Sequence, residues 1–163
     1  MAQAFLHGAF DHALRIRGKM RRMTTLDPTA LPHPLRLQPG DDLRTALQAA
    51  LAAQGASAAF VLAGIGSLRP AVLRLAGADA PQRIDADCEI LTLSGSLGAN
   101  GVHLHMSVAD DSGRVLGGHV SEGCIVRTTA EVLLMLLPGW HFTREADPGT
   151  GWAELVVRRR TGA

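Results

Sequence analysis

An alternating run in the middle of the chain constrains the fold most. From Val102 to Val108 the sequence reads VHLHMSV, with apolar residues at even positions and His103, His105 and Ser107 at odd ones. Residues two apart lie on the same face of a β-strand, so this alternation predicts a strand with one apolar and one polar face. Both imidazoles therefore project from the polar face.

The residues after this run predict a β-hairpin. Residues 110–113, Asp-Asp-Ser-Gly, have the composition of a turn. A second strand is expected over 114–121, and it carries Gly-Gly-His with the histidine at His119. Pairing of the two strands would bring His119 alongside the first two histidines. The two glycines would leave room for a ligand beside the rings.

Three neutral imidazoles on one sheet face suit zinc or another divalent transition metal. The spacing is His-x-His-x13-His, so the predicted metal ligands are His103, His105 and His119. Three protein ligands leave one coordination position open, which is typical of catalytic rather than structural zinc. The alternative is that the three histidines lie on a solvated or interface face and hydrogen-bond to their neighbours.

The segment around the histidines resembles the core signature of the PPC family, the domain shared by plants and prokaryotes. The matching elements are, in order, Leu93-Ser94-Gly95, His103-Leu104-His105, Gly117-Gly118-His119, Glu122-Gly123-Cys124-Ile125-Val126 and Thr129-Ala130-Glu131. The resemblance covers roughly residues 35–157. It implies an α+β domain that assembles as a homotrimer. Plant members carry an AT-hook ahead of this domain, which underlies the DNA-binding label of the family, and no Arg-Gly-Arg-Pro element occurs in this sequence.

The PPC fold is similar to that of acetolactate decarboxylase, a zinc enzyme that also uses a His-x-His pair and a later histidine. This similarity implies an alternative to a regulatory or DNA-binding role, namely a metal-dependent lyase or hydrolase acting on a small carboxylate. Glu122 and Glu89 are the candidate acids for such a reaction, and Arg127 is the candidate to hold an anionic group. Each of the three is also explained as a structural or surface residue.

The chain as a whole predicts an α+β fold, with one helix packed on an antiparallel-rich sheet of about seven strands. Residues 1–34 are expected to be a basic extension that ends in a proline-rich linker, residues 35–157 the folded domain, and residues 158–163 a basic tail. The helix should begin after Asp41 or Asp42, which can cap it, and end at Gly55.

Apolar runs and alternation predict the strands. They are expected over residues 35–38, 57–68, 71–75, 85–97, 124–137 and 152–158, with 140–143 as an extension of the strand before it. The run over 57–68 predicts a strand buried on both faces. Alternation in 85–97 places Cys88, Ile90 and Thr92 on one face and Glu89, Leu91 and Leu93 on the other. Residues 127–129 are expected to interrupt their strand, with a helix capped by Thr128 or Thr129 as the alternative.

The charge distribution limits the macromolecular partners. The net charge is +1, but residues 1–25 carry +4 and Arg158, Arg159 and Arg160 carry +3, so residues 26–157 carry −6. Phosphate binding requires clustered basic residues, so nucleic acid is expected to contact only the two ends of the chain. A small-molecule ligand is the other candidate partner.

The compartment follows from the apolar segments and the cysteines. No apolar run is long enough to span a membrane, and the N-terminus lacks the apolar segment of a signal peptide. Cys88 and Cys124 lie in apolar, strand-like runs, where free thiols act as small core residues. We therefore expect a cytoplasmic, reduced protein without a membrane partner.

Overall fold

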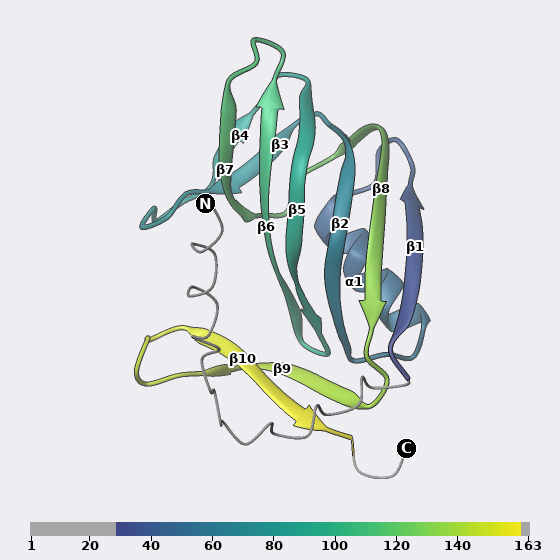
Figure 1. Ribbon diagram of the computed structural model, residues 1–163. Helices are drawn as coiled ribbons and strands as arrows, with labels where there is room; N and C mark the ends of the chain where they lie inside the picture. Colours follow the sequence, from purple (N-terminus) through teal and green to yellow (C-terminus); the bar gives the residue numbers. More distant parts are fainter. Residues whose placement is uncertain (1–28, 161–163) are drawn as a thin grey trace, which may run out of the picture.

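In the part of the chain that the structure describes, one helix packs on an antiparallel sheet. A computed structural model describes residues 29–160, so the expected basic extension over residues 1–25 lies outside the described residues. Within residues 29–160, ten strands form an eight-stranded sheet and a separate two-stranded hairpin, and the helix α1 (Leu43–Ala53) covers part of the sheet (Figure 1). The α+β, antiparallel prediction is confirmed, with more strands than the seven expected.

The strands follow one another along the chain as β1 (Leu31–Leu37), β2 (Ala58–Leu68), β3 (Ala71–Arg74), β4 (Gln82–Ile84), β5 (Cys88–Gly98), β6 (Gly101–Asp110), β7 (Val115–Val120), β8 (Val126–Leu136), β9 (Trp140–Ala146) and β10 (Ala153–Arg159). The order in the large sheet is β1-β8-β2-β5-β6-β7-β3-β4, and β9 pairs with β10.

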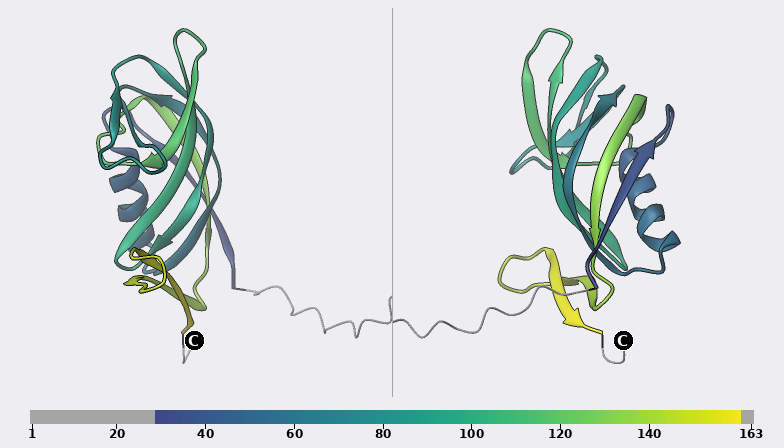
Figure 2. Two further views of the ribbon diagram at one scale, coloured as in Figure 1. Left: turned by 90° about the vertical axis from the view of Figure 1, so that its left-hand side faces the viewer. Right: turned by 45° about the vertical axis from the view of Figure 1, so that its right-hand side comes forward.

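The helix begins and ends where the sequence predicts. Asp42 is its N-cap: Oδ1 accepts from the backbone N–H of Thr45 at 2.9 Å, and Oδ2 accepts from the N–H of Gly123 at 2.6 Å. Gly55, with φ +61°, follows the last turn. The buried leucines of α1 are Leu43, Leu47 and Leu51. Figure 2 shows α1 against one face of the sheet only.

The opposite sheet face is open, so the prediction that β2 is buried on both faces is wrong. Leu62 is 53% exposed and Ile65 is 59% exposed, because α1 covers only the other face. Register shifts between Val61 and Ala63 in β2, and between Ile90 and Thr92 in β5, also change which residues face the core. Leu93 is therefore buried, and it does not share a face with exposed Glu89 as expected.

The proline-rich segment expected to be a linker is partly a strand. β1 begins at Leu31 and pairs on one side only, with β8. Pro32 and Pro34 are tolerated because an edge strand has a row of backbone groups that needs no partner.

β8 runs through 127–129 as one strand, so the expected break in the strand is absent. The pairing is nevertheless irregular there, because β1 pairs with β8 only from Ala130 onward and the β2–β8 ladder shifts register between Val126 and Ala130. Thr128 caps no helix; its hydroxyl lies 2.6 Å from that of Ser67, within hydrogen-bonding distance.

The C-terminal hairpin β9–β10 leaves the sheet instead of extending β8. It lies at the lower end of the sheet in Figure 1, where Phe142 packs edge-to-face on Phe60 with ring centroids 5.6 Å apart. Arg158 and Arg159 belong to β10, so two of the three arginines assigned to the tail lie on a strand. Within residues 29–160, no helix combines the length and apolar character needed to cross a bilayer.

Candidate metal centre

The histidine hairpin forms as predicted. His105 of β6 lies directly opposite His119 of β7, and His103 precedes His105 by two residues on the same face. The alternate residues Leu104 and Met106 are buried at 1% and 3% exposure, so the apolar side of β6 faces the core. The three rings therefore meet on the face opposite α1.

Their nitrogen atoms are close enough to share one ion. His103 Nε2 lies 3.0 Å from His119 Nδ1 and 3.0 Å from His105 Nε2, and the three ligand atoms all lie within 4.8 Å of one another. Two nitrogens bound to one tetrahedral zinc at about 2.0–2.1 Å would be about 3.3 Å apart. The donor set and its spacing therefore fit a zinc-like ion.

Hydrogen bonding alone leaves the cluster poorly satisfied. A ring nitrogen carries either one proton or one lone pair. His103 Nε2 therefore cannot form a full hydrogen bond to both neighbouring rings at once, although both lie 3.0 Å away. An ion at the common point would use one lone pair from each ring.

The local electrostatics favour neutral rings. Burial lowers the pKa of His103, and Arg144, His105 and His119 lower it further, while Glu154 acts in the opposite direction. Burial also lowers the pKa of His119, with further contributions from His105 and Arg74. A lowered pKa preserves the neutral imidazole, which is the form that binds metal.

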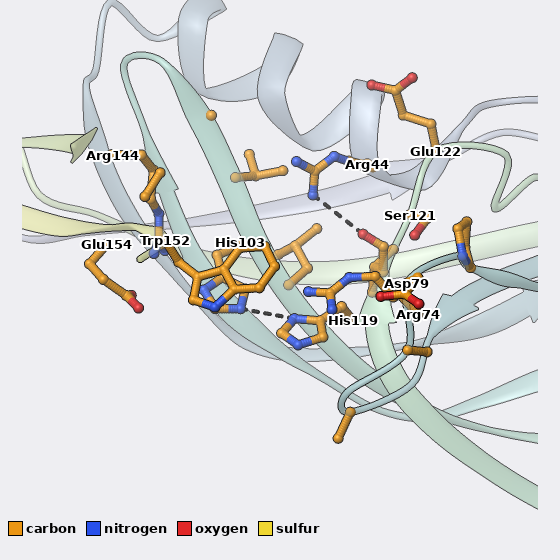
Figure 3. Close-up of a pocket in the computed structure, with 18 of the residues that line it drawn as sticks. Arg44, Arg74, Asp79, His103, His119, Ser121, Glu122, Arg144, Trp152 and Glu154 are labelled. Carbon is orange, nitrogen blue, oxygen red and sulfur yellow. Dashed lines mark hydrogen bonds between the residues drawn. The ribbon is translucent and has the colours of Figure 1, made fainter. Parts of the chain in front are cut away.

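A pocket opens beside the rings because β7 follows β6 for only part of its length. β6 pairs with β7 from His105 to Ala109, whereas it pairs with β5 along its whole length. The resulting pocket has a volume of about 1200 Å³, and His103, His119, α1 and the β9–β10 hairpin contribute to its walls. Figure 3 shows His103 and His119 side by side at this pocket.

Two arginines that the sequence gave no reason to select flank the cluster. Arg74 lies directly opposite His119 in the β3–β7 pair. The Arg144 Nη2 donates to Ser96 Oγ at 2.7 Å, and Ser96 lies directly opposite His103 in the β5–β6 pair. Their positions depend on strand register, and no local motif marks either residue.

Of the three further candidate residues, only Glu122 reaches the pocket. Glu122 lines it, but in Figure 3 its side chain lies beyond Arg44 and projects away from the histidines. Glu89 pairs with Ala109 at the other end of β5, seven residues from Ser96 and so roughly 20 Å away along the strand. Arg127 forms an ion pair with Asp87 at 2.8 Å. The structure thus does not bring Glu89 or Arg127 to the cluster.

The chain is similar to known proteins over most of its length. The model of the Plants and Prokaryotes Conserved (PCC) domain matches residues 27–138. A bifunctional protein GlmU from Synechococcus sp. (strain JA-2-3B'a(2-13)) is 45% identical over 130 residues, which cover 80% of this chain and 21% of that protein. The chain thus spans about a fifth of the length of the curated relatives it matches.

Solved structures share the fold. A hypothetical protein from Salmonella enterica has a TM-score of 0.78 and 37% identity, covering 81% of this chain and 96% of its own. A metal-containing protein from Archaeoglobus fulgidus has a TM-score of 0.67 and 27% identity, covering 77% and 93%. A candidate DNA-binding protein from Bacteroides thetaiotaomicron has a TM-score of 0.67 but 18% identity, covering 78% and 91%, and shows the fold alone.

Proposed function

Because the chain belongs to the family of the Plants and Prokaryotes Conserved domain, called PCC or PPC, we propose that it is a metal-dependent small-molecule-binding domain. His103, His105 and His119 would hold one divalent ion, with zinc as the best match to three imidazoles. The observation that carries this proposal is the convergence of the three ring nitrogens within 4.8 Å. The metal-containing relative from A. fulgidus supports it.

The chemistry of the site follows from its open position. When bound, zinc would supply Lewis acidity towards a ligand or water at its fourth position. The protein's own residues lower the pKa of His103 and His119, fix the orientation of the rings through the β6–β7 pairing, and provide an adjacent pocket.

Metal content of the protein purified without a histidine tag tests this proposal. We expect about one zinc per chain in the wild type and less than about one tenth of that in His105→Ala, because a two-histidine site binds far more weakly. The control is His141→Ala, since His141 bonds to Ser57 outside the cluster. Full zinc content in His105→Ala, with circular dichroism unchanged, would contradict the assignment.

A metal-dependent lyase or hydrolase acting on a small carboxylate is the second candidate function. It is favoured by a three-ligand site that opens onto a pocket large enough for a metabolite. Such a reaction also needs an acid or base, and Glu122 and Glu154 both line the pocket. Zinc-dependent turnover that Glu122→Gln or Glu154→Gln reduces would favour the enzyme, and zinc-dependent binding without turnover would favour the binding domain.

We propose a homotrimer as the assembly. Its support is the open sheet face, on which Phe60, Leu62, Ile65 and Leu91 are between 40% and 59% exposed. An apolar face of this kind marks a protein–protein interface more often than a solvated surface. Light scattering at micromolar protein should report three subunits, and a stable monomer would exclude the trimer.

Nucleic-acid binding, if the protein has it, is proposed for the chain ends. In the C-terminal segment, Arg158 is already paired with Glu145 at 2.6 Å, and the guanidinium carbon of Arg159 lies 4.4 Å from the Trp140 ring centroid. The basic residues at 1–25 would then carry most of the affinity. Deleting residues 1–25 should abolish salt-sensitive binding to duplex DNA. Tight, sequence-dependent binding by the truncated chain would contradict this placement.

We infer a cytoplasmic location from the thiols. Cys88 and Cys124 are both free and buried, as expected for a protein in a reducing compartment. Fractionation of the native cells tests this inference, and recovery of the protein with an oxidising compartment would oppose it.

A further inference from the structure

The pocket beside the histidines has a cation on each side, and we propose that Arg74 and Arg144 hold a small dicarboxylate there. This proposal deepens the proposed metal-dependent function by naming the ligand class. The two arginines are distinct from the three proposed metal ligands, so their role can be tested separately.

Arg144 is held in position from several directions. Its Nη2 donates to Ser96 Oγ at 2.7 Å, and Ser96 is only 6% exposed. Its backbone N–H donates to Asn100 Oδ1 at 2.8 Å, and Asn100 Nδ2 donates back to its carbonyl oxygen at 3.0 Å. The Arg144 side chain is therefore held at Ser96, directly across from His103, and it would lose little conformational freedom on binding an anion.

Arg74 approaches from the other side. It lies opposite His119 across the β3–β7 pair, so the two side chains share a face of the sheet. Its guanidinium carbon lies 5.9 Å from the centroid of the Trp152 ring, within the range of a cation–π contact. In Figure 3, Arg144 and Arg74 stand on opposite sides of His103 and His119.

Neither arginine has a carboxylate partner in the part of the chain that the structure describes. The five ion pairs within residues 29–160 involve other arginines. A third cation, Arg44 of α1, also lines the pocket and uses its Nη1 to donate to the carbonyl oxygen of Val120 at 3.3 Å. Two partly buried guanidinium groups without an acidic partner are unusual unless an anion from outside completes them.

Three acids also line the pocket, namely Asp79, Glu122 and Glu154. None lies within 4.0 Å of the two arginines. Figure 3 shows Glu122 on the far side of Arg44, Asp79 beside Arg74, and Glu154 towards the hairpin.

The arrangement selects a ligand with two anionic ends. Guanidinium groups bind carboxylates through paired hydrogen bonds, and each group here would hold one carboxylate. Arg74 lies on β3 and Ser96, the anchor of Arg144, on β5, so three strand spacings, about 14 Å, separate their backbones. Long side chains reaching inwards from both ends leave room for a short dicarboxylate, whereas a single phosphate would meet only one of them.

Part of this site comes from beyond the family match. The family model matches residues 27–138, whereas Arg144 and Trp152 belong to the C-terminal hairpin and the turn within it. The histidines lie inside the match. The hairpin therefore contributes Arg144 to the anion site, whereas Arg74 and the three histidines belong to the shared part of the domain.

Calorimetric titration of the full-length protein with succinate tests the proposal, with zinc content measured on each sample. Arg144→Gln and Arg74→Gln should each weaken succinate binding at least tenfold while zinc content stays at the wild-type value. Arg114→Gln is the matched control, because Arg114 pairs with Asp110 at the turn of the β6–β7 hairpin, away from the pocket. It should bind succinate as the wild type does. Thermal melting reports folding, and if Arg144→Gln does not fold, Arg74→Gln decides the outcome.

The other outcomes distinguish failure of the anion site from failure of the metal site. Equal succinate binding by wild type and both variants would mean that the arginines hold no anion, even if zinc is present. Binding of inorganic phosphate but not succinate would refute the dicarboxylate assignment, as would binding of neither. If the wild type holds no zinc, the metal proposal fails. Arginine-dependent succinate binding by that same zinc-free protein would still support the anion site.

Discussion

A single charge on the open sheet face should dissociate the trimer, and Ile65→Glu is the sharpest version of this test. Ile65 is 59% exposed in the isolated chain, and Leu62 and Leu91, at 53% and 49%, are also exposed on β2 and the neighbouring β5. The substitution should leave the folded subunit intact, because the side chain contributes little to the subunit's own core. It should oppose assembly, because assembly would remove the carboxylate from water.

The magnitude follows from the exposed fraction. Full burial of an isoleucine contributes about 1.5–3 kcal/mol, so the 59% still exposed is worth about 1–2 kcal/mol per copy in an interface. Three copies per trimer give about 3–5 kcal/mol before the cost of desolvating the glutamate is added. At about 1.4 kcal/mol per factor of ten, the association constant should fall by at least two to three orders of magnitude.

Sedimentation velocity over a range of micromolar concentrations measures this effect. Wild type should sediment as a trimer, and Ile65→Glu should shift to monomer at concentrations where the wild type stays assembled. Val157→Glu is the matched control, since Val157 is 48% exposed but lies on β10. A variant that remains as trimeric as the wild type, or a monomeric wild type, would refute the assignment of this face as the interface.

Three further predictions concern the fold and the titrating groups. Asp42→Ala removes the acceptor of two backbone N–H groups. It should lower the free energy of unfolding by about 2–3 kcal/mol in urea titrations, and Asp42→Asn should lower it less. A loss below about 1 kcal/mol would contradict the role of Asp42 as acceptor of both bonds. In metal-free protein, the pKa values of His103 and His119 lie below their ordinary value of 6.5. The unfolded chain therefore binds more protons just below pH 6.5, and stability should fall as the pH drops through the folded pKa values. His103→Gln should flatten that fall, and an unchanged slope would count against it. Burial raises the pKa of Cys124 to about 11 and also raises that of Cys88, so neither thiol should react with a disulfide reagent at pH 8 until the protein unfolds; rapid reaction in the native state would contradict the burial.

The sequence predicted the parts of the molecule that depend on local pattern. Strict alternation determined which face of β6 carries the histidines, and the Asp-Asp-Ser-Gly turn determined where the chain reverses. Asp41 or Asp42 was predicted as the helix cap from its place before a leucine-rich helical pattern, and Asp42 is the cap. These features need only neighbours within a few residues, so single-sequence reasoning reaches them.

Features that depend on long-range register were not predictable. The bulge between Ile90 and Thr92 inserts one residue into β5, so the residues after it face the opposite way from the simple alternation, and Leu93 faces the core. Arg74 and Arg144 reach the histidines only because β3 pairs with β7 and Ser96 of β5 lies opposite His103. The sequence instead pointed to Glu89 and Arg127, which alternation alone cannot place along the length of a strand.

The predicted bounds of β1 and β8 were wrong because the position of each segment in the sheet outweighed the usual preference of its residues. Pro32 and Pro34 read as a linker, but an edge strand tolerates them. Residues 127–129 were expected to break their strand, but they form an irregularity in the β2–β8 pairing within one continuous strand.

The most direct test of the central claim is anomalous diffraction at the zinc edge from crystals of the tag-free protein loaded with zinc. The account predicts one strong peak per chain at about 2.0–2.1 Å from His103 Nε2, His105 Nε2 and His119 Nδ1 together. A peak bound elsewhere on the chain, or no peak at the three rings when zinc is in excess, would contradict it.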